Sequence, residues 1–571
     1  MLSNRRIATF ALTIFLGAGS LYAITPNATT PNEHSVTPAS PTINADPAQV
    51  GSWGGPYAWP VIAIHSFLLP TGKVLQYSLP AQVPSGIYIW NPQDWEFTQA
   101  LVSRPLFCSG HSFLADGRIL VTGGNGPSPE GEFRGTKDAH IFDPFTETRS
   151  RVEDMAGGRW YPTNVTLADG RVLVFSGLDE LTGAVNGDIE LFDPSTGSWQ
   201  IVNQTFLPLF PRTCVLTTGD VFYSGPSRET GLLDINTWQW YDVRLNNFGR
   251  RNDGLSVLLP PGPDKVMIVG GREDSLVTET AEIIDLNDSV PSWSYTAPMN
   301  FPRMHGNIVI LPDATIMVVG GHSTMHSADT LTPPTTVYEP EIYDPLTETW
   351  SVMAPMTRPR QYHSTALLLP DARILLAGSN NEFTGEIYSP PYLFRGPRPV
   401  IDFAPAEVAY GVTFNVRFTS ETTSNTICLV RLSSVTHSVN MDQRYVHLAD
   451  VDGNFNVAVL APSGGTYAPP GYYLLFVVSE DGVPSMANMI HLDDDVAGCC
   501  NFPGDADNSG DVNVGDATFL ITYIFRRGAT PPCLDEADSD GSDDITIGDA
   551  TYIVKYVFQS GGYPICGTTG T

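Results

Sequence analysis

One pattern recurs through most of this chain of 571 residues and limits what it can fold into. Each copy has an apolar strand, a tight Gly, Asp or Pro turn and a second apolar strand that often ends in Gly-Gly. Paired apolar runs around such a turn predict a β-hairpin. The copies start at His65, His111, Asn164, Cys214, Ser256, Asn307 and Ser364. A second signature, an Asp-Pro turn as in FDPFTET, FDPSTGSW and YDPLTETW, lies between copies.

The copies follow one another at intervals of about 50 residues, which is the period of kelch repeats. A four-stranded sheet cannot bury both of its faces alone, so neighbouring sheets must stack in a ring. We therefore expect residues 51–397 to form a seven-bladed kelch-type β-propeller. The frequent turns, with 52 glycines and 47 prolines, also favour an all-β protein over a helical bundle.

Four of the hairpins have a chemically distinctive residue eight positions before the turn. These residues are Cys108 before Asp116, Tyr161 before Asp169, His305 before Asp313 and His363 before Asp371. Equal offsets place these side chains at equivalent points near the propeller axis, and Tyr362 lies beside His363. Thiol, phenol and imidazole groups suit a redox-active transition metal, copper above all, better than Mg²⁺ or Ca²⁺. The alternative is that each residue packs or hydrogen-bonds in the central channel.

Longer strings around these residues resemble the copper radical oxidases, the galactose oxidase and glyoxal oxidase group, over residues 60–495. The strings are LFCSG, GRWYPTNVTLADGRV, RQYHSTALLLPDAR, THSVNMDQR, EIYSPPYLF and PGYYLLFVV. The resemblance implies that copper is held by Tyr161, Tyr362, His363 and His437. It also implies a thioether bond between Cys108 and the ring of Tyr161, which stores one electron as a radical.

In that family, a primary alcohol or small aldehyde is oxidised by O2, which becomes H2O2. By the resemblance, Tyr362 takes the hydroxyl proton and the Tyr161 radical takes a hydrogen atom from the carbon. Galactose oxidases have a stacking tryptophan where this chain has Asp179, so the glyoxal oxidase branch fits better, although carbohydrate substrates stay open. Trp160 could shield Tyr161 instead, or pack in the core.

Other residues near the predicted site have less distinctive roles. We expect His305 and Met304 to line the channel, and Arg251 and Arg303 are candidates for orienting substrate.

Residues 398–494 contain short β runs without the propeller signature, over the length of a sandwich domain. We expect an Ig-like early-set domain here. The resemblance implies that one of its loops carries His437 into the propeller to complete the metal site.

Residues 499–571 contain two acidic loops, each followed by an apolar-periodic segment that predicts a helix. Oxygen donors fall at the six positions of an EF-hand loop: Asp505, Asp507, Ser509, Asp511, Asn513 and Asp516, then Asp538, Asp540, Ser542, Asp544, Thr546 and Asp549. Gly510 takes the sharp-turn position of the first loop and Asp543 that of the second. With one helix per loop, the segment resembles a type I dockerin, a small helical calcium-binding domain that implies a cohesin-type partner. Cys499, Cys500, Cys533 and Cys566 predict two disulfides, with three possible connectivities.

The N-terminus predicts export. Arg5 and Arg6 precede an apolar run that ends in small residues at Ala23, so residues 1–23 are typical of a signal peptide. Residues 24–50 are rich in Pro, Thr, Asn and Ser and predict a disordered linker. We therefore expect a secreted or cell-surface protein with no membrane span after cleavage. A net charge of −31 argues against a nucleic acid partner.

The alternative function is a non-catalytic kelch propeller that binds a carbohydrate or protein ligand and is tethered through its dockerin. The two hypotheses differ in whether Cys108 and Tyr161 form the thioether. The sequence does not identify the substrate, the docking partner or the oligomeric state.

Overall fold

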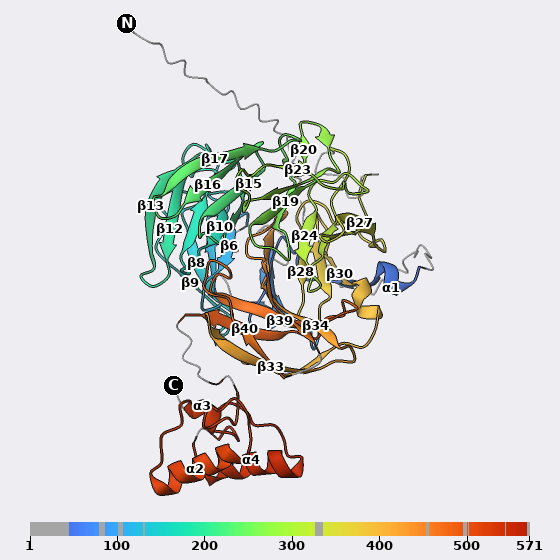
Figure 1. The fold of residues 1–571 in the computed structure, drawn as a ribbon. Helices are drawn as coiled ribbons and strands as arrows, with labels where there is room; N and C mark the ends of the chain where they lie inside the picture. The colour runs from blue at the N-terminus through green and yellow to red at the C-terminus, as the bar shows by residue number, and fades with distance from the viewer. Residues whose placement is uncertain are drawn as a thin grey trace, which may run out of the picture.

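The computed structural model describes residues 45–78, 86–100, 107–129, 132–325, 335–452, 456–494, 500, 502–542 and 544–567. The predicted signal peptide, most of the predicted linker, Cys499 and Asp543 lie outside these ranges. The described chain is mostly β-strand, in many small sheets, with helices concentrated in the C-terminal tail (Figure 1). The prediction of a mainly β protein is therefore confirmed.

Each predicted hairpin forms the inner two strands of one antiparallel sheet. The sheets are β2 (His65–Leu68), β3 (Val74–Tyr77), β4 (Ile87–Trp90), β5 (Phe97–Ala100); β6 (Gly110–Phe113), β7 (Ile119–Thr122), β8 (Ala139–Asp143), β9 (Thr148–Arg151); β10 (Thr163–Thr166), β11 (Val172–Phe175), β12 (Asp188–Asp193), β13 (Ser198–Gln204); β14 (Arg212–Val215), β15 (Val221–Gly225), β16 (Glu229–Asp234), β17 (Gln239–Leu245); β18 (Leu255–Leu258), β19 (Lys265–Val269), β22 (Ala281–Asp285), β23 (Ser294–Tyr295); β24 (Asn307–Ile310), β25 (Ile316–Val319), β26 (Glu341–Asp344), β27 (Thr349–Val352); and β28 (Ser364–Leu368), β29 (Ile374–Gly378), β30 (Thr384–Ser389) with β1 (Ser52–Ala58). A separate two-stranded ribbon joins β20 (Arg272–Glu273) to β21 (Leu276–Val277).

The innermost strands of these sheets close into a ring. Strands β6, β10, β14, β18, β24, β28 and β2 contact one another in this order, and β35 (Ser434–Thr436) lies between β2 and β6. The N-terminal strand β1 pairs with β30, with Trp53 opposite Tyr388, so the last sheet is completed by the start of the described chain. The ring brings residues from distant repeats to one central channel.

The last part of the predicted linker is ordered. Residues Pro47–Val50 form a short helix, α1, in which the side chain of Asp46 accepts the N–H of Ala48. The carbonyl of Val50 accepts hydrogen bonds from Tyr388 and Ala354. The expectation of disorder up to residue 50 was therefore wrong at its C-terminal end, because an Asp-Pro helix start and contacts with the last sheet fix the backbone there.

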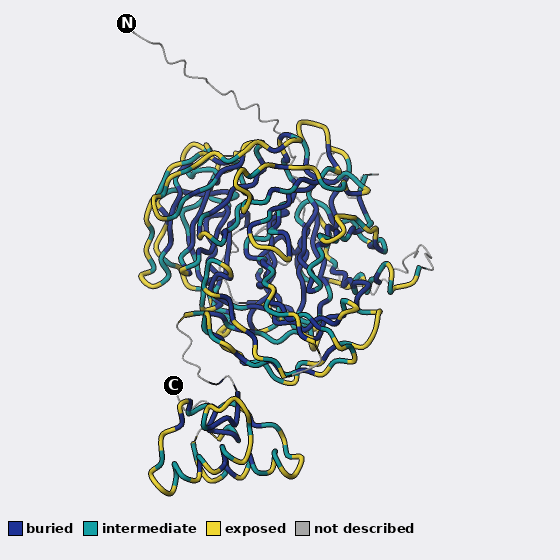
Figure 2. Tube along the Cα trace, viewed as in Figure 1, coloured by how far each residue is buried: buried dark blue, intermediate teal, exposed yellow. Residues whose placement is uncertain are grey.

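Burial decreases from the channel outward, as Figure 2 shows in the colouring of the strands. Strands β2, β6 and β10 are buried at every residue, whereas the outer strands β9 and β13 are largely exposed. This gradient explains why the inner hairpins carry most of the apolar residues, although polar residues such as His65 and Asn164 are also buried there.

Four sheets contain the same buried ion pair between an arginine before the inner strand and a glutamate on the third strand. The pairs are Arg159–Glu190, Arg251–Glu282, Arg303–Glu341 and Arg360–Glu386, each between 2.7 and 2.9 Å. Each glutamate also accepts backbone N–H groups from the segment before its arginine. The pairs therefore fix the segments that lead into the inner strands.

A β-sandwich follows the ring after the short 3₁₀-helix η1 (Pro391–Phe394). Its smaller sheet contains β31 (Val400–Phe403), β33 (Thr413–Thr419) and β38 (Asn456–Leu460). Its larger sheet contains β32 (Glu407–Ala409), β40 (Asn488–Asp493), β39 (Gly471–Ser479), β34 (Ser424–Arg431) and β37 (Tyr445–Asp452). Between β34 and β37 the chain leaves the sandwich as a hairpin of β35 and β36 (Val439–Asn440).

The tail forms a separate helical unit below the sandwich (Figure 1). Helices α2 (Val514–Arg526) and α4 (Ile547–Gln559) follow the two acidic loops and pack together, with Leu520 and Ile553 buried between them. A shorter helix, α3 (Leu534–Ala537), precedes the second loop. Cys500 forms a disulfide with Cys566, and Cys533 is also disulfide-bonded. None of the helices in the described residues is long and apolar enough to cross a membrane.

Candidate metal centre

The residues predicted from the equal offsets share one backbone conformation. Cys108, Tyr161, His305 and His363 all have a positive φ, between 57° and 69°. This left-handed conformation is unfavourable for residues with a side chain, and it recurs only where surrounding structure imposes it. This point lies one or two residues before the inner strand of a sheet begins, and we call it the lead position of that sheet.

Two further lead positions were not predicted. Phe210 and Asp253 have φ values of 46° and 59° and occupy the same place in the sheets that start at β14 and β18. Phe210 lies eight residues before Thr218, and Asp253 lies eight residues before Pro261. The offset of eight residues was therefore present in both sheets. The turn after Phe210 lacks an aspartate at that position, and the turn after Asp253 is longer.

Backbone hydrogen bonds link neighbouring lead positions around the channel. Tyr161 donates its N–H to the carbonyl of Cys108 at 3.0 Å, and Phe210 donates to Tyr161 at 2.9 Å. On the other side, His305 donates to the carbonyl of Asp253 at 2.9 Å. These bonds set the spacing between side chains that are about 50 residues apart in the sequence.

His437 reaches the channel on the hairpin from the sandwich. Strand β35 pairs with β2, with Thr436 opposite His65, so the hairpin extends the first sheet by two strands. The hydroxyl of Thr436 donates to the carbonyl of Ile64 at 2.9 Å. Past the hairpin, Asp442 accepts the N–H of Phe113 at 3.1 Å. The hairpin is thus fixed to several sheets of the ring, and His437 is held at its tip with a φ of 47°.

The four predicted metal ligands converge. The hydroxyl groups of Tyr161 and Tyr362 are within hydrogen-bonding distance of each other. The ring of His437 lies 4.6 Å from that of Tyr161, 5.4 Å from that of Tyr362 and 4.8 Å from that of His363, measured between centroids. Two phenols and two imidazoles from three parts of the chain therefore surround one point.

The imidazoles are oriented for a metal ion. His363 Nδ1 is 2.8 Å from Asn380 Oδ1, so Nδ1 carries the proton and Nε2 keeps its lone pair. His363 Nε2 is buried and has no hydrogen-bond partner among the described residues. His437 Nδ1 is likewise held, 2.6 Å from Thr436 Oγ1. A buried nitrogen lone pair without a donor, next to two phenols, fits a copper ion.

Burial also sets the charge states of this cluster. It lowers the pKa of His363 to about 3 and the pKa of His437 well below its usual value, so both imidazoles are neutral at pH 7. Burial, with the nearby Cys108, raises the pKa of both Tyr161 and Tyr362 well above the usual value. A phenolate is stable here only when a cation is bound beside it, because the positive charge of the metal ion offsets the cost of burying the negative charge.

Cys108 is completely buried beside Tyr161. Its Sγ lies 3.8 Å from His437 Nε2, and its thiol interacts with Tyr161. The backbone N–H of Cys108 donates to His65 Nε2 at 3.1 Å, and His65 Nδ1 lies 3.1 Å from His111 Nε2. This buried chain fixes the position of the sulfur. Cys108, Cys214 and Cys428 are the free cysteines of the described chain.

Aromatic rings cover both sides of Tyr161. Trp160 stacks on it with centroids 3.6 Å apart and an angle of 10°, and Phe210 lies at 4.4 Å. Phe133, which is 50% exposed, stacks on Trp160 at 4.6 Å and extends the wall to the surface. Asp179 does not form part of this wall, because its carboxylate accepts the N–H groups of Leu181, Thr182 and Gly183 in its own turn.

The other predicted residues near the site fall into two groups. His305 lies against Tyr362, with ring centroids 4.8 Å apart, and Met304 is buried beside it. Arg251 and Arg303 are not positioned to orient substrate. Both are buried inside sheets and bind Glu282 and Glu341, respectively, because residues two positions before the lead position point away from the channel.

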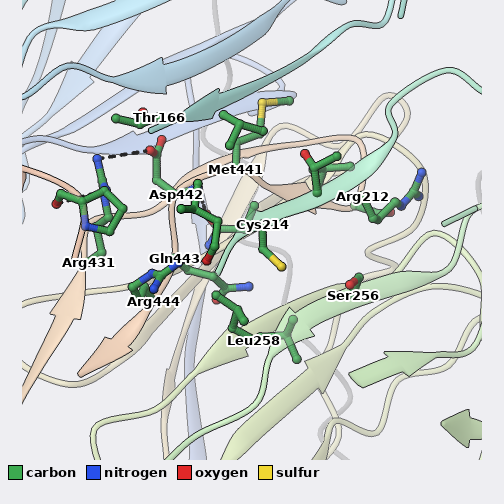
Figure 3. A pocket seen from close by; sticks show the side chains of 18 residues that line it. Thr166, Arg212, Cys214, Ser256, Leu258, Arg431, Met441, Asp442, Gln443 and Arg444 are labelled. Atoms are coloured by element: carbon green, nitrogen blue, oxygen red, sulfur yellow. Dashed lines mark hydrogen bonds and ion pairs between the residues drawn. The ribbon is translucent and has the colours of Figure 1, made fainter. Parts of the chain in front are cut away.

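One cavity lies apart from the candidate metal centre. It has a volume of about 60 Å³ and lies between the sheets of β10, β14 and β18 and the chain that follows His437 (Figure 3). Its lining includes Arg212, Cys214, Asp442 and Arg444 but none of the predicted metal ligands. Asp442 points toward Arg431 at 3.7 Å.

In the tail, each acidic loop brings three carboxylates together. Asp505, Asp507 and Asp516, and in the second loop Asp538, Asp540 and Asp549, have ligand atoms within 4.8 Å of one another. Ser509 and Ser542 lie at the same loops, Asp511 and Asp544 are exposed, and Asn513 and Thr546 cap α2 and α4. Gly510 has a φ of 88°, as the sharp turn requires.

Comparisons with known proteins agree with this architecture. Residues 272–392 match the glyoxal oxidase N-terminus family, and residues 398–492 match the galactose oxidase-like early set domain. The chain is 30% identical to an aldehyde oxidase of Vitis pseudoreticulata, over 68% of this chain and 82% of that protein. It is 29% identical to a galactose oxidase of Gibberella zeae, over 78% and 71% of the two chains. A fungal alcohol oxidase of the AA5 family, solved in complex with copper, has a TM-score of 0.69 at 27% identity and covers 78% of this chain and 100% of its own.

Proposed function

Because the chain belongs to the galactose oxidase and glyoxal oxidase family of copper-dependent oxidases, we propose that it is a secreted copper radical oxidase. It would oxidise a primary alcohol or a small aldehyde with O2 and release H2O2. The convergence of Tyr161, Tyr362, His363 and His437, with Cys108 against Tyr161, carries this proposal. In this reading, residues 51–397 are a seven-bladed kelch-type propeller and residues 398–494 an Ig-like early-set domain.

Copper would be held by the hydroxyl oxygens of Tyr161 and Tyr362 and by Nε2 of His363 and His437. When bound, it supplies a Lewis acid for the substrate oxygen and accepts one electron. Asn380 and Thr436 keep the two imidazoles in the tautomer that leaves Nε2 free.

The protein's own residues divide the two-electron oxidation into transfers of a proton and a hydrogen atom. The hydroxyl oxygen of Tyr362 accepts the proton of the substrate hydroxyl as general base. Tyr161, joined to Cys108 Sγ and oxidised to a radical, takes a hydrogen atom from the adjacent carbon. These two transfers remove two protons and one electron from the substrate, and the second electron is the one that bound copper would accept. O2 then takes up two protons and two electrons to become H2O2. Forming the thioether removes one hydrogen each from the thiol and the ring, with O2 as oxidant.

The aromatic wall supports radical storage at Tyr161. Trp160 and Phe210 cover its two faces, so water has little access to the oxidised ring. Trp160 would take the role for which galactose oxidases use a later tryptophan. With Asp179 turned into its own loop, we favour small aldehydes and alcohols over galactose as substrates.

A peroxide assay on the copper-loaded protein tests this function. We expect H2O2 from at least one member of a panel of small alcohols, aldehydes and sugars, and no H2O2 after Cys108→Ser. A Tyr77→Phe variant removes a hydroxyl that bonds Ser109 near the same cysteine and serves as a packing control. If no panel member gives H2O2 while the protein binds copper and is folded, the alternative of a non-catalytic binding propeller is favoured.

For the tail, we propose a dockerin-like module that binds one calcium ion in each loop. The support is the three clustered carboxylates of each loop and the helix that follows it. A cohesin-type partner is the docking hypothesis, and isothermal titration with a type I cohesin, in calcium and in EDTA, tests it. Heat evolved only in calcium would support docking, and no heat in either condition would refute it.

A further inference from the structure

A polar cluster lies beside the candidate metal centre, in sheets that follow those of the aromatic wall around the ring. It consists of Asp253, His305, His322 and Arg272, and we call it the mouth cluster. The proposed reaction assigns no role to these residues. Of these four residues, only His305 was predicted from the sequence to line the channel.

The fold aims two members of the cluster at the channel. Asp253 and His305 occupy lead positions, with φ values of 59° and 57°, as Tyr161 and His363 do. Their backbones are joined by the hydrogen bond from His305 N–H to the Asp253 carbonyl. Aspartate is one of the few residues that tolerate this left-handed conformation, so the placement costs little there.

The hydrogen bonds within the mouth cluster show which side chain can still accept a hydrogen bond from a ligand. His305 Nε2 lies 3.3 Å from Asp253 Oδ1, and His305 Nδ1 lies 3.0 Å from His322 Nε2, so both ring nitrogens of His305 are used. Arg272 Nε donates to Asp253 Oδ2 at 3.0 Å. A carboxylate has about four lone-pair sites, so Asp253 can still accept two more hydrogen bonds.

The cluster is close to the reacting groups and open to solvent. The His305 ring contacts that of Tyr362 at 4.8 Å between centroids. The side chains of Asp253, Arg272 and His305 are 29%, 25% and 18% exposed. Burial alone would raise the pKa of Asp253. The charge and hydrogen bond of His305, together with Arg272, instead hold this pKa well below its usual value. An ionised acceptor therefore stands next to the proposed base, at a place a substrate can reach.

We propose that Asp253 is a substrate-binding residue that accepts a hydrogen bond from a second hydroxyl, at or next to the reacting carbon. This inference rests on the proposed oxidase function. The substrate class is then a vicinal diol or polyol, or a hydrated aldehyde, rather than a simple alcohol. His305 and Arg272 act as positioning residues that hold the carboxylate. The aromatic wall around Tyr161 would contact the carbon–hydrogen face of such a molecule.

Ethylene glycol and ethanol form the matched pair for the test, and acetaldehyde, which hydrates in water, tests the geminal diol. We expect kcat/KM for ethylene glycol to exceed that for ethanol by about 10- to 100-fold, the value of one hydrogen bond to a charged group. Asp253→Asn, which suits the left-handed backbone, should bring this ratio close to one. The matched control is Asp169→Asn, whose carboxylate binds Arg171 in a turn outside the site. It should keep the ratio.

A ratio near one in the unaltered enzyme, or an unchanged ratio in a folded Asp253→Asn variant, would overturn the proposal. A binding readout separates this failure from that of the proposed function. Isothermal titration of the copper-loaded protein with ethylene glycol and with ethanol gives this binding readout. If no substrate gives peroxide, the oxidase proposal fails. Tighter binding of the glycol that is lost in Asp253→Asn still supports the mouth cluster, and equal binding of both molecules refutes it.

Discussion

The side chain of Asn380 gives a direct test of how the metal centre is built. Its Oδ1 accepts the Nδ1–H of His363 at 2.8 Å and so keeps Nε2 as the ligand atom. Asn380→Ala removes this acceptor, and the imidazole can then rotate or take the other tautomer. Losing such a partner of a metal-bound histidine costs about 10- to 100-fold in metal affinity, which corresponds to about 1.4 to 2.7 kcal/mol.

The assay is a copper titration against a competing chelator of known affinity, with unaltered protein and variant at the same pH. Asn381 is the matched control, because it is the adjacent asparagine, is exposed and has a φ of 57° that glycine tolerates. We expect Asn380→Ala to bind copper at least 10-fold more weakly and Asn381→Gly to bind as the unaltered protein does. Equal affinity for all three proteins would refute the assignment of His363 Nε2 as a ligand.

Three further predictions concern stability. Glu341→Gln leaves the buried Arg303 without a counter-charge. It should lower the free energy of unfolding, measured in urea, by about 3 to 5 kcal/mol. A loss below about 1 kcal/mol would contradict the role of these ion pairs. Burial raises the pKa of Asp442 to about 6, above the unfolded value of about 3.9. Its contribution is therefore complete below pH 4 and is lost as the pH rises through 6, so stability relative to Asp442→Asn should fall by about 3 kcal/mol between pH 4 and pH 8. Calcium at about 1,000 times its Kd should stabilise the tail by about 4 kcal/mol for each occupied loop in thermal unfolding. Asp516→Asn should reduce this gain. Asp511→Asn should not, because Asp511 is exposed and its loop position donates the backbone carbonyl rather than the side chain. No shift with calcium would contradict the loops as metal sites.

Local patterns were sufficient to predict the inner hairpins. The runs and turns that start at His65 and Asn307 became β2–β3 and β24–β25 with the expected pairing, because a buried hairpin is rich in apolar residues on both sides of a tight turn. The equal offsets before the turns predicted that Cys108, Tyr161 and His363 would meet, because equivalent positions in stacked sheets face one channel.

Features that depend on distant contacts could not be predicted in this way. His437 was assigned only through the family resemblance, since its hairpin pairs with β2 across about 370 residues and has no periodic signal. Phe210 and Asp253 were missed because their turns depart from the common form. Arg251 and Arg303 were misplaced because an offset does not tell whether a side chain faces the channel or a glutamate inside its sheet.

The central claim is that Cys108 and Tyr161 form the redox cofactor, and intact-mass analysis tests it most directly. The thiol is buried against Tyr161, beside the group of residues that would hold copper. After loading with copper in air, the protein should lose the mass of two hydrogens beyond that lost to its disulfides, and Cys108→Ser should not. A mass unchanged by copper, in protein that binds the metal and is folded, would contradict the proposed radical oxidase.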